Sequence, residues 1–599
     1  MKKYLLVLAG LYCVLSYALA EHPDYPELKK SDANIIGHVL DKKTKEHLPY
    51  ITIALKGTTI GTVTDATGHY FLKNLPEGNF ILEVSSVGYK TVTRNVTLKK
   101  GKTLEEDFEI EEDAIALDGV VVSANRSETT RRLAPTLVNV VDLKLFETTN
   151  SSTLSQGLNF QPGVRVETNC QNCGFQQVRI NGLDGPYTQI LIDSRPVFSA
   201  LSGVYGLEQI PASMIERVEV MRGGGSALFG SSAIAGTINI ITKEPLRNSG
   251  QLSHTLTALG GGSSFDNNTS LNASLVTDDH RAGLYIFGQN RHRSGYDYDG
   301  DGFTELPKLK NQTVGFRSYL KTSTYSKLTF EYHHMQEFRR GGDMLDRPPH
   351  EAHIAEQLQH SIDGGSLKFD YFSPDEKNRL SIFASAANTD RDSYYGPGND
   401  PLKAYGKTTD LTAMGGAQYV HTFDKCFFMP SDLTAGLEYN RDRLKDNMWG
   451  YDRHTDQTVN IYSAFLQNEW KNDRWGILIG GRLDKHNMVD NVIFSPRANL
   501  RFNPTQNINL RLSYSSGFRA PQAFDEDMHI ENVGGTVAMI ERAKNLKEEK
   551  SQSFSASADM YHRFGVFQTN FLIEGFYTRL TDVFVLGEPY DRGDGILVK

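Results

Sequence analysis

Apolar and polar residues alternate along much of the chain after residue 246. Successive side chains of a β-strand point to opposite faces, so a period of two predicts strands with one apolar and one polar face. The clearest segments are residues 282–290, 314–321, 327–333, 366–371, 380–386, 417–423, 433–439, 459–470, 475–483 and 508–514. We count roughly fifteen or sixteen such segments in this part of the chain, which predicts a large antiparallel sheet.

Short turns and longer polar stretches separate these segments in alternation. The short turns are expected at residues 324–326, 375–377, 471–473 and 503–505. This asymmetry is typical of a transmembrane β-barrel, whose apolar face meets lipid and whose interior is polar. A soluble sandwich is the alternative reading of the same alternation.

Two smaller strand-rich units are expected before this sheet. Residues 34–112 contain six or seven short strands separated by Gly, Pro and Asp turns, which predicts an antiparallel β-sandwich. An acidic link, residues 105–113, follows it. Residues 125–245 contain short Val- and Ile-rich runs, with a glycine-rich turn at 223–230. The predicted strands of the first unit are residues 35–40, 51–55, 59–64, 70–72, 79–85 and 90–98.

The N-terminus has the pattern of a secretory signal. Lys2 and Lys3 precede an apolar run over residues 4–19, and Ala18-Leu19-Ala20 forms a cleavage site, so residues 1–20 are predicted to be removed. A retained anchor is the alternative. No run of 18 apolar residues follows, which excludes helical membrane spans. The net charge of −9, without a basic cluster, makes nucleic acid an unexpected partner.

Five motifs, in order, resemble TonB-dependent outer-membrane receptors. They are Asp118-Gly119-Val120-Val121-Val122, residues 179–182, Ile192-Asp193, residues 215–220 and residues 236–242. The resemblance implies that residues 125–245 are the plug domain, and that residues 246–599 are part of a 22-stranded transmembrane barrel. It also implies that residues 117–124 are the TonB box, which comprises Asp118, Gly119, Val120, Val121, Val122, Ser123 and Ala124.

The valines of that box have a physical meaning of their own. Three consecutive β-branched residues in a polar neighbourhood form an edge strand with which another chain can pair. From the residues alone, the last strand of the preceding sandwich is an equally good interpretation. The resemblance favours the edge strand that pairs with another chain.

The first unit resembles the carboxypeptidase-regulatory-like domain, a transthyretin-like sandwich, over residues 34–112. This arrangement is similar to that of Bacteroidetes-type receptors. No zinc or nucleophile constellation is apparent in this stretch of sequence, and the chain is not expected to be an enzyme.

The strand count falls short of a closed barrel. A plugged transporter barrel has about 22 strands, and an unclosed one leaves unpaired edges in hydrocarbon. The chain also ends at Lys599 without a terminal aromatic residue. We therefore expect a C-terminally truncated fragment that lacks about six strands.

Two motifs suggest covalent or metal chemistry. Cys170 and Cys173 form a CxxC, for which a local disulfide is the first interpretation and soft-metal capture the second. Alternating carboxylates resemble a calcium loop, although Lys308 stands where an EF-hand has its bidentate glutamate. An ordinary solvated acidic loop is the alternative. The carboxylates are Asp297, Asp299, Asp301 and Glu305.

Cargo contacts are expected in the longer loops. Phe518-Arg519-Ala520-Pro521 and Asn545-Leu546-Lys547 resemble the FRAP and NPDL signatures of haem receptors, and His529 falls between them as a haem-ligand candidate. The second motif lacks its Pro and its acidic residue. Histidines also gather around Arg339-Arg340, for which solvated loop histidines are the alternative to metal or haem capture. They are His333, His334, His350, His353 and His360.

The resemblance implies active uptake across the outer membrane. TonB, with its inner-membrane energy-transducing complex, is expected to pull on the TonB box and rearrange the plug. The expected cargo is a ferric siderophore or haem, with cobalamin, or a glycan or peptide, as alternatives; a porin needs neither plug nor box. No cofactor is expected to be required; calcium in an extracellular loop is an option, with an ordinary solvated acidic loop as the alternative. The expected location is the outer-membrane lipid.

Overall fold

The structure is a computed structural model of the chain. The predicted signal peptide and part of the predicted TonB box, Asp118 and Gly119, lie outside the residues that it describes. Among those residues, no helix combines the length and apolar character needed to cross a membrane. The described ranges are 30–49, 51–65, 67–86, 89–111, 120–126, 129–170, 174–196, 208, 210–397, 404–523, 530–533, 536–543, 545–565, 567–593 and 596–599.

The N-terminal domain is a sandwich of two four-stranded sheets. Inward-facing residues alternate with exposed ones; Ile53 and Leu55 on one strand and Leu82 and Val84 on its neighbour are fully buried. These side chains belong to a closed apolar core, and all six predicted strands are present. One sheet contains β1 (Lys30–Asp41), β4 (His69–Pro76), β7 (Thr103–Glu105) and β8 (Phe108–Ile110); the other contains β2 (Thr52–Leu55), β3 (Gly61–Val63), β5 (Gly78–Ser86) and β6 (Tyr89–Leu98).

The acidic link predicted at residues 105–113 was wrong in part, because Glu105 and residues 108–110 belong to strands of the sandwich. Phe108 and Ile110 are fully buried and Glu109 between them is exposed, so the strand alternation continues to Ile110. β7 and β8 both pair in parallel with β1, whereas the sequence predicted antiparallel strands. The charged residues of this stretch cover the outer face of a strand.

The second unit, which we call the plug, contains a five-stranded sheet in the order β11-β16-β17-β14-β15. The predicted runs of Val and Ile form β14, β16, β17 and part of a separate hairpin, β12–β13. Their buried side chains form the plug core. The elements are β9 (Val120–Val121), β10 (Thr129–Thr130), β11 (Val138–Asp142), α2 (Leu143–Thr148), α3 (Leu154–Leu158), β12 (Val164–Cys170), β13 (Phe175–Ile180), η1 (Gly185–Tyr187), β14 (Thr188–Ile192), β15 (Arg195–Pro196), η2 (Ala212–Met214), β16 (Ile215–Arg222), α5 (Ser226–Phe229) and β17 (Gly236–Thr242).

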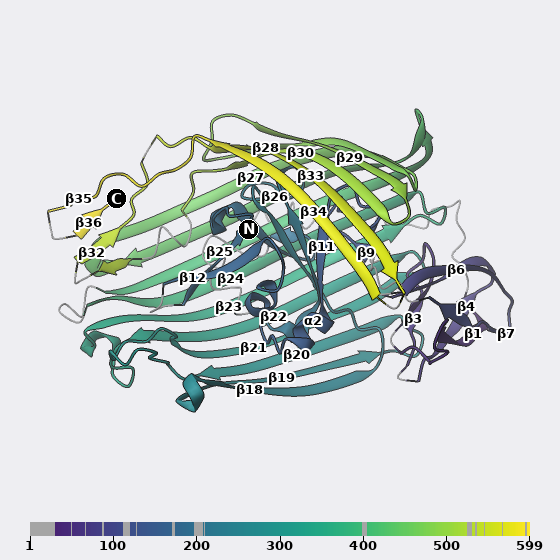
Figure 1. Cartoon of the computed structure of the whole chain (residues 1–599), viewed down its shortest axis with the longest axis horizontal. Coiled ribbons are helices and arrows are strands. Elements are labelled where there is room, and N and C mark those ends of the chain that lie inside the picture. Colours follow the sequence, from purple (N-terminus) through teal and green to yellow (C-terminus); the bar gives the residue numbers. More distant parts are fainter. Residues whose placement is uncertain are drawn as a thin grey trace, which may run out of the picture.

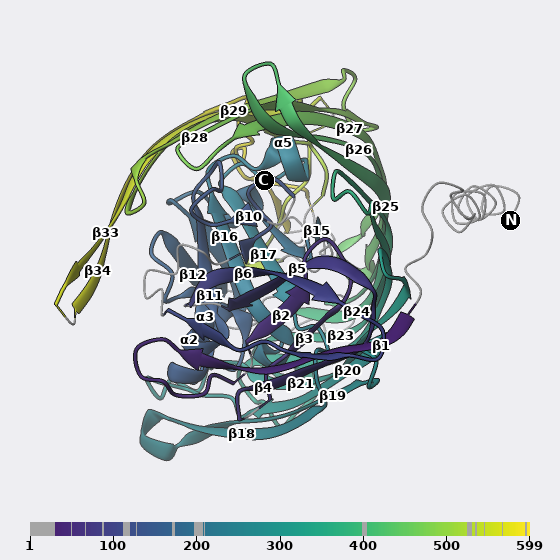
Figure 2. The same cartoon turned by 90° about the vertical axis from the view of Figure 1, so that its right-hand side faces the viewer.

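The third unit is a 15-stranded antiparallel sheet, the barrel sheet, which curls around the plug (Figures 1 and 2). Within the described residues, β18 pairs only with β19 and β34 only with β33, so the sheet has two free edges. The number agrees with the fifteen or sixteen strands predicted. They are β18 (Ser249–Leu259), β19 (Ser264–Val276), β20 (Ala282–Arg293), β21 (Lys308–Ser323), β22 (Ser326–Gly342), β23 (Ile354–Phe372), β24 (Asn378–Pro397), β25 (Tyr405–Cys426), β26 (Met429–Met448), β27 (Arg453–Lys471), β28 (Trp475–His486), β29 (Ile493–Thr505), β30 (Ile508–Arg519), β33 (Glu549–Phe564) and β34 (Phe567–Thr581).

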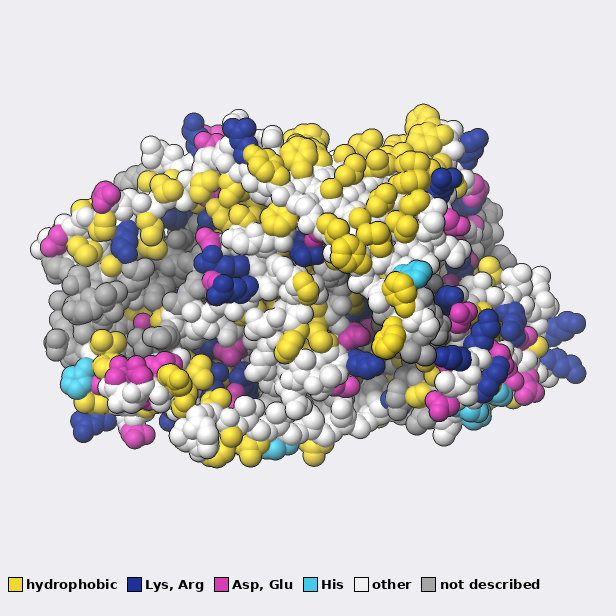
Figure 3. All heavy atoms as spheres, in the orientation of Figure 1, with side chains coloured by type: hydrophobic (Ala, Val, Ile, Leu, Met, Phe, Trp, Pro, Cys, Tyr) yellow, Lys and Arg dark blue, Asp and Glu magenta, His cyan; other side chains and the backbone are white. Residues whose placement is uncertain are grey.

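The barrel sheet is apolar outside and charged inside. On β28, Ile479 and Leu483 are exposed, whereas Arg482, Asp484 and His486 are buried toward the plug. Figure 3 shows a broad apolar area over the later strands of the sheet. The predicted alternation of strands with one apolar and one polar face is therefore confirmed.

The two ends of the barrel sheet differ. At one end the strands join through short turns, and the N-terminal domain lies there: the Thr59 amide donates to the Thr324 carbonyl at 2.9 Å. The turn predicted at residues 503–505 lies within β29, because pairing continues to Thr505. At the other end a small sheet of loop strands packs beside Tyr394 and Tyr451. The small sheet contains β31 (Glu531–Val533), β32 (Thr536–Met539), β35 (Tyr590–Asp591) and β36 (Ile596–Val598). Three short helices lie in loops between strands of the barrel sheet: η3 (Gly260–Gly262), η4 (Pro349–Glu351) and η5 (Trp449–Tyr451).

Candidate functional site

The described part of the predicted TonB box, Val120 to Ala124, lies between the plug and the barrel sheet. β9 pairs with β10, so this edge strand already has a partner within the chain. Val121 is fully buried. The amides of Val122 and Ser123 and the Ser123 hydroxyl donate to Oε2 of Glu219, at 2.9, 2.8 and 2.8 Å. One buried plug carboxylate thus satisfies three donors of the segment.

The residues that follow are held by the barrel wall. Nη1 of Arg126 lies 2.5 Å from Oε1 of Glu438 on β26, and its guanidinium also covers the Phe465 ring. The Asn125 carbonyl accepts from Gln467 at 3.0 Å, and the Ala124 carbonyl accepts from Arg497 at 3.1 Å. Three barrel strands thereby fix three consecutive residues, the last of the predicted box and the two that follow it.

A second plug carboxylate, Glu208, is surrounded by arginines of the barrel. Its oxygens lie 2.8 Å from Arg339 on β22, and 3.4 and 3.6 Å from Arg291 and Arg293 on β20. Burial alone would raise the pKa of Glu208, but the three guanidiniums outweigh it and lower the pKa to about 2. Glu208 is therefore a carboxylate over the whole physiological pH range.

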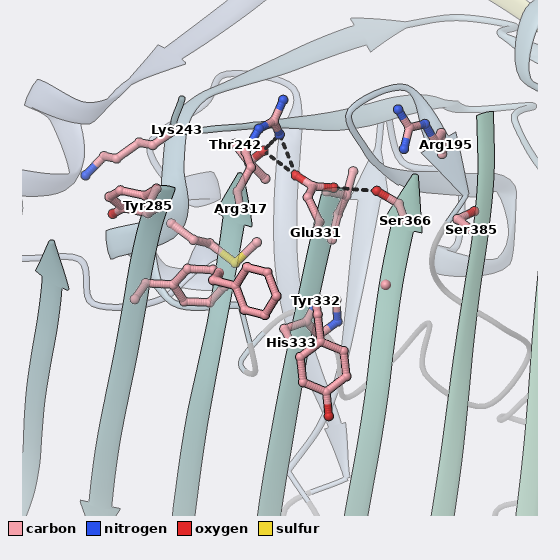
Figure 4. Close-up of a pocket in the computed structure, with 15 residues that line it drawn as sticks. Arg195, Thr242, Lys243, Tyr285, Arg317, Glu331, Tyr332, His333, Ser366 and Ser385 are labelled. Atoms are coloured by element: carbon pink, nitrogen blue, oxygen red, sulfur yellow. Dashed lines mark hydrogen bonds and ion pairs between the residues drawn. The ribbon is translucent and has the colours of Figure 1, made fainter. Parts of the chain in front are cut away.

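A third contact lies nearer the short-turn end, where Arg317 of β21 bridges the plug and the wall (Figure 4). Its Nη1 lies 2.5 Å from both Oδ2 of Asp193 in the plug and Oε1 of Glu331 on β22, and it also contacts the Thr242 hydroxyl. Burial alone would raise the pKa of Asp193, but the guanidiniums of Arg317 and Arg195 outweigh it and lower the pKa to about 2. This contact is also ionic at neutral pH.

A cavity opens beside this ion pair, between the plug and β20–β24. Arg195 and Lys243 of the plug reach its rim, and Ser366 from the wall donates to Glu331 at 2.7 Å. Its lining mixes cations, a carboxylate, hydroxyls and aromatic rings. Nothing here resembles a nucleophile and base arranged for catalysis; the lining can pass or hold a hydrated polar group.

Phe518 and Arg519, the first two residues of the haem-receptor-like motif, lie where β30 ends. Phe518 is fully buried against Val489 and Ile493, so its ring packs the wall. Arg519 lies 3.5 Å from Glu549 and covers the Tyr187 ring of the plug at 5.7 Å. Both side chains have structural partners in this state, and a role in cargo binding stays a prediction.

The predicted cargo histidines do not form one cluster. His350 Nδ1 lies 2.8 Å from the Tyr405 hydroxyl, while the mostly exposed His353 lies 2.6 Å from Asp343. His333, His334 and His360 belong to β22 and β23 rather than to a loop. His529 lies outside the described residues. Haem ligation by His529 stays a prediction.

The other two predicted sites are partly described. Cys170 ends β12 and its thiol donates to Glu356 of the wall at 3.2 Å, but Cys173 lies outside the described residues, so the disulfide stays a prediction. Asp297, Asp299 and Glu305 bring one carboxylate oxygen each within 4.8 Å of the others. Asp301 does not join them; its Oδ1 accepts from the Phe303 amide at 2.8 Å. Calcium binding likewise stays a prediction.

Sequence reasoning missed the charged contacts between plug and wall. Their partners lie far apart along the chain: Asp193 and Arg317, Glu208 and Arg339, Arg126 and Glu438. A local signal existed, because charged residues occupy the inward positions of strands whose outward positions are apolar. Such residues need buried partners, although the sequence does not say which ones.

A strand-built plug held by buried ion pairs inside an outward-apolar sheet defines a plugged-barrel receptor. Three family models cover this architecture: the CarboxypepD_reg-like domain over residues 35–122, the TonB-dependent Receptor Plug Domain over 130–237, and the TonB dependent receptor-like, beta-barrel over 238–596. The last covers more than half of the chain. The chain belongs to the TonB-dependent receptor family, as its motifs predicted.

Curated relatives include two proteins named Vitamin B12 transporter BtuB from Vibrio vulnificus. The one from strain CMCP6 is 25% identical over 68% of this chain, and the one from strain YJ016 is 29% identical over 35%. The chain spans 64% and 39% of their respective lengths.

Solved structures share the fold. The siderophore receptor PirA from Acinetobacter baumannii has a TM-score of 0.64 at 18% identity, covering 78% of this chain and 76% of its own. The ferric enterobactin receptor PfeA from Pseudomonas aeruginosa has a TM-score of 0.62 at 18% identity, covering 77% and 76%.

Proposed function

We propose that the protein takes up a scarce iron complex, a ferric siderophore or haem, across the outer membrane with energy supplied through TonB. The observation that carries the proposal is the position of Val120 to Ala124, a segment that begins with the two-residue strand β9 and lies directly before the plug inside the barrel sheet. The segment is joined to the plug by Glu219 and continues into residues fixed by the wall. A pull on it is transmitted to both.

The plug supports transport by rearrangement rather than by a fixed pore. Its contacts with the wall include ion pairs and hydrogen bonds beside apolar contacts with Tyr285 and Phe287. Water can replace the polar contacts at small net cost, since buried ion pairs gain little over hydrated ions. The family and its solved structures support a receptor of this kind, to which we assign no catalytic step.

Cobalamin is the second candidate cargo, and the names of both curated relatives favour it. Uptake of a glycan or peptide is the third candidate function. None of the relatives and solved structures named above is described as a glycan or peptide importer. We propose further that the carboxylates of Asp297, Asp299 and Glu305 bind calcium and order the loop between β20 and β21. If the heat of calcium binding measured by calorimetry is lost in the Asp299→Asn protein, this calcium-site assignment is supported.

Uptake by cells decides between the cargoes. A strain that lacks the native gene is compared with the same strain after the gene is restored. Each is given a radiolabelled compound: ferric siderophore or haem as the only source of iron, or cyanocobalamin as the only source of cobalamin. Restoration of iron uptake alone supports the proposal; restoration of cobalamin uptake alone replaces it with the second candidate. Uptake that persists without TonB contradicts both.

A further inference from the structure

Three histidines from separate segments lie together on the exposed surface of the N-terminal domain. They are His38 on β1, His47 in the connection between β1 and β2, and His69 at the start of β4. Their ring centroids are 5.1, 5.6 and 5.0 Å apart. Histidine side chains are visible on the lower surface of this domain in Figure 3. Sequence separations of nine and 22 residues hide this grouping.

The backbone of the sandwich brings the three together. His38 and His69 are direct cross-strand partners on β1 and β4. His47 is placed beside them because the next residue, Leu48, donates its amide to the Val39 carbonyl at 2.8 Å. Gly68 permits this approach: its φ is +78°, and a Cβ there would lie 2.8 Å from the His47 Cβ. Paired strands therefore fix two members, and a close contact fixes the third.

The neighbours of two rings indicate which nitrogen carries the proton. Nδ1 of His38 lies 3.1 Å from Oδ1 of Asp107, within ion-pair distance, and this oxygen accepts a hydrogen bond from the His38 backbone amide at 3.0 Å. The Thr67 hydroxyl donates to Asp65 at 2.7 Å, so at 3.1 Å it accepts from Nδ1 of His69. In the neutral rings, Nδ1 is then the donor and Nε2 carries the lone pair.

We propose that His38, His47 and His69 bind a divalent first-row transition-metal ion, with Zn²⁺ as the reference ion. Three imidazoles at metal–nitrogen distances of ~2.0–2.1 Å in tetrahedral geometry place their ring centres about 5 Å apart, as here. A ligating histidine usually donates its other nitrogen to a carboxylate or similar acceptor. Asp107 and Thr67 already provide such acceptors.

Binding requires the rings to turn. Their planes are now inclined at 28°, 33° and 58° to one another, closer to stacking than to convergence on one point. His47 and His69 are exposed, so rotation about their side-chain bonds meets little resistance. The bound ion would join β1, β4 and the β1–β2 connection, leaving a fourth position for water. This inference concerns the sandwich alone and does not rest on the transported cargo.

The test is metal binding by the purified full chain in detergent, without a polyhistidine tag and stripped with chelator. Zn²⁺ is titrated calorimetrically, and Co²⁺ is added separately, because its visible absorption reports tetrahedral nitrogen coordination. We expect one Zn²⁺ per chain and a tetrahedral Co²⁺ spectrum. Both disappear in His69→Ala and in the exposed-loop variant His47→Gln. Asp107→Asn is expected to weaken Zn²⁺ binding about 10–100-fold while leaving the three ligands in place.

Two controls make the result specific. His454→Ala, at a half-exposed histidine near the start of β27, should leave Zn²⁺ binding unchanged. All titrations are repeated with Cys170→Ser, so that zinc held by the CxxC is not counted. The proposal is overturned if the unsubstituted chain binds no Zn²⁺, or if its Zn²⁺ affinity is the same after substitution of His47 and His69.

Discussion

The N-terminal sandwich and the plug are both small β-units, yet they are stabilised differently. The sandwich encloses an apolar core of its own and contacts the barrel sheet through a few atoms, such as the Thr59 amide and the Thr324 carbonyl. The plug has an apolar core too, but buried charges such as Glu208 and Asp193 join it to the wall. Apolar burial favours one permanent arrangement, whereas charged contacts can be exchanged for water.

The largest effect is expected where the plug meets its predicted partner. Val121→Pro removes a backbone donor from the strand that TonB would pair with. We expect uptake to fall to the level of a TonB-deleted strain, with cargo binding to cells unchanged, as measured with radiolabelled cargo. The same substitution in the sandwich strand β7, at Leu104, should leave transport largely intact. Unaltered uptake with Val121→Pro would contradict the assignment of this segment.

The sandwich should respond to a loss of buried apolar volume as an independent core does. Ile53 is fully buried between the two sheets, so Ile53→Ala should destabilise this domain by about 2–5 kcal/mol. Urea titration followed by proteolysis would show earlier cleavage within residues 30–111, with plug peptides unaffected. Simultaneous loss of protection in the plug would show that the two units are energetically coupled.

The plug should respond to a lost charge rather than to lost volume. Glu208→Gln leaves three arginines without their shared carboxylate, at a cost of about 2 kcal/mol. The cost is moderate because Arg339 retains Glu337 and Arg291 retains Asp266. Protease sensitivity of plug peptides in urea measures it. Glu216→Gln is the matched control, since Glu216 is half-exposed and pairs with the adjacent Arg217.

Acid should reveal a smaller difference in stability between the sandwich and the plug. The pKa values of Asp193 and Glu208 are lowered to about 2, so their contribution is complete above their ordinary values and is lost as pH falls through about 2. Pepsin digestion from pH 5 to 2 should therefore cut the plug only at the acid end. Cleavage that begins near pH 5 would show that the arginines do not hold these carboxylates ionised.

Much of the fold was predictable, because alternation is a local property. β28 shows why: Ile479 and Leu483 face outward and Arg482 and Asp484 inward, and the sequence alone displays that period. The acidic link was misread because charge on the outer face of β8 concealed the buried Phe108 and Ile110. Contacts between distant segments, such as Arg317 with Asp193, depend on how the sheet curls and have no local pattern.

The candidate sites were less predictable than the fold. The sequence singled out histidines near Arg339, but the group that lies together is His38, His47 and His69, which strand pairing assembles. The alternating carboxylates were found in part, since Asp297, Asp299 and Glu305 approach one another and Asp301 does not. Residue spacing within one loop predicts which side chains lie close together better than does the sequence separation of residues on different strands.

The two-residue pairing of β9 with β10 also sets how the chain responds to mechanical force. Val120 pairs with Thr130 and Val121 with Thr129, so a load entering at Val120 and a restraint beyond Thr130 act at the same end of the hairpin. That is unzipping geometry, in which the pairs break one after another instead of sharing the load in shear. Once this pairing and the hydrogen bonds to Glu219 on β16 have opened, residues 120–130 can extend over about 35–40 Å, which lengthens the tether that precedes β11.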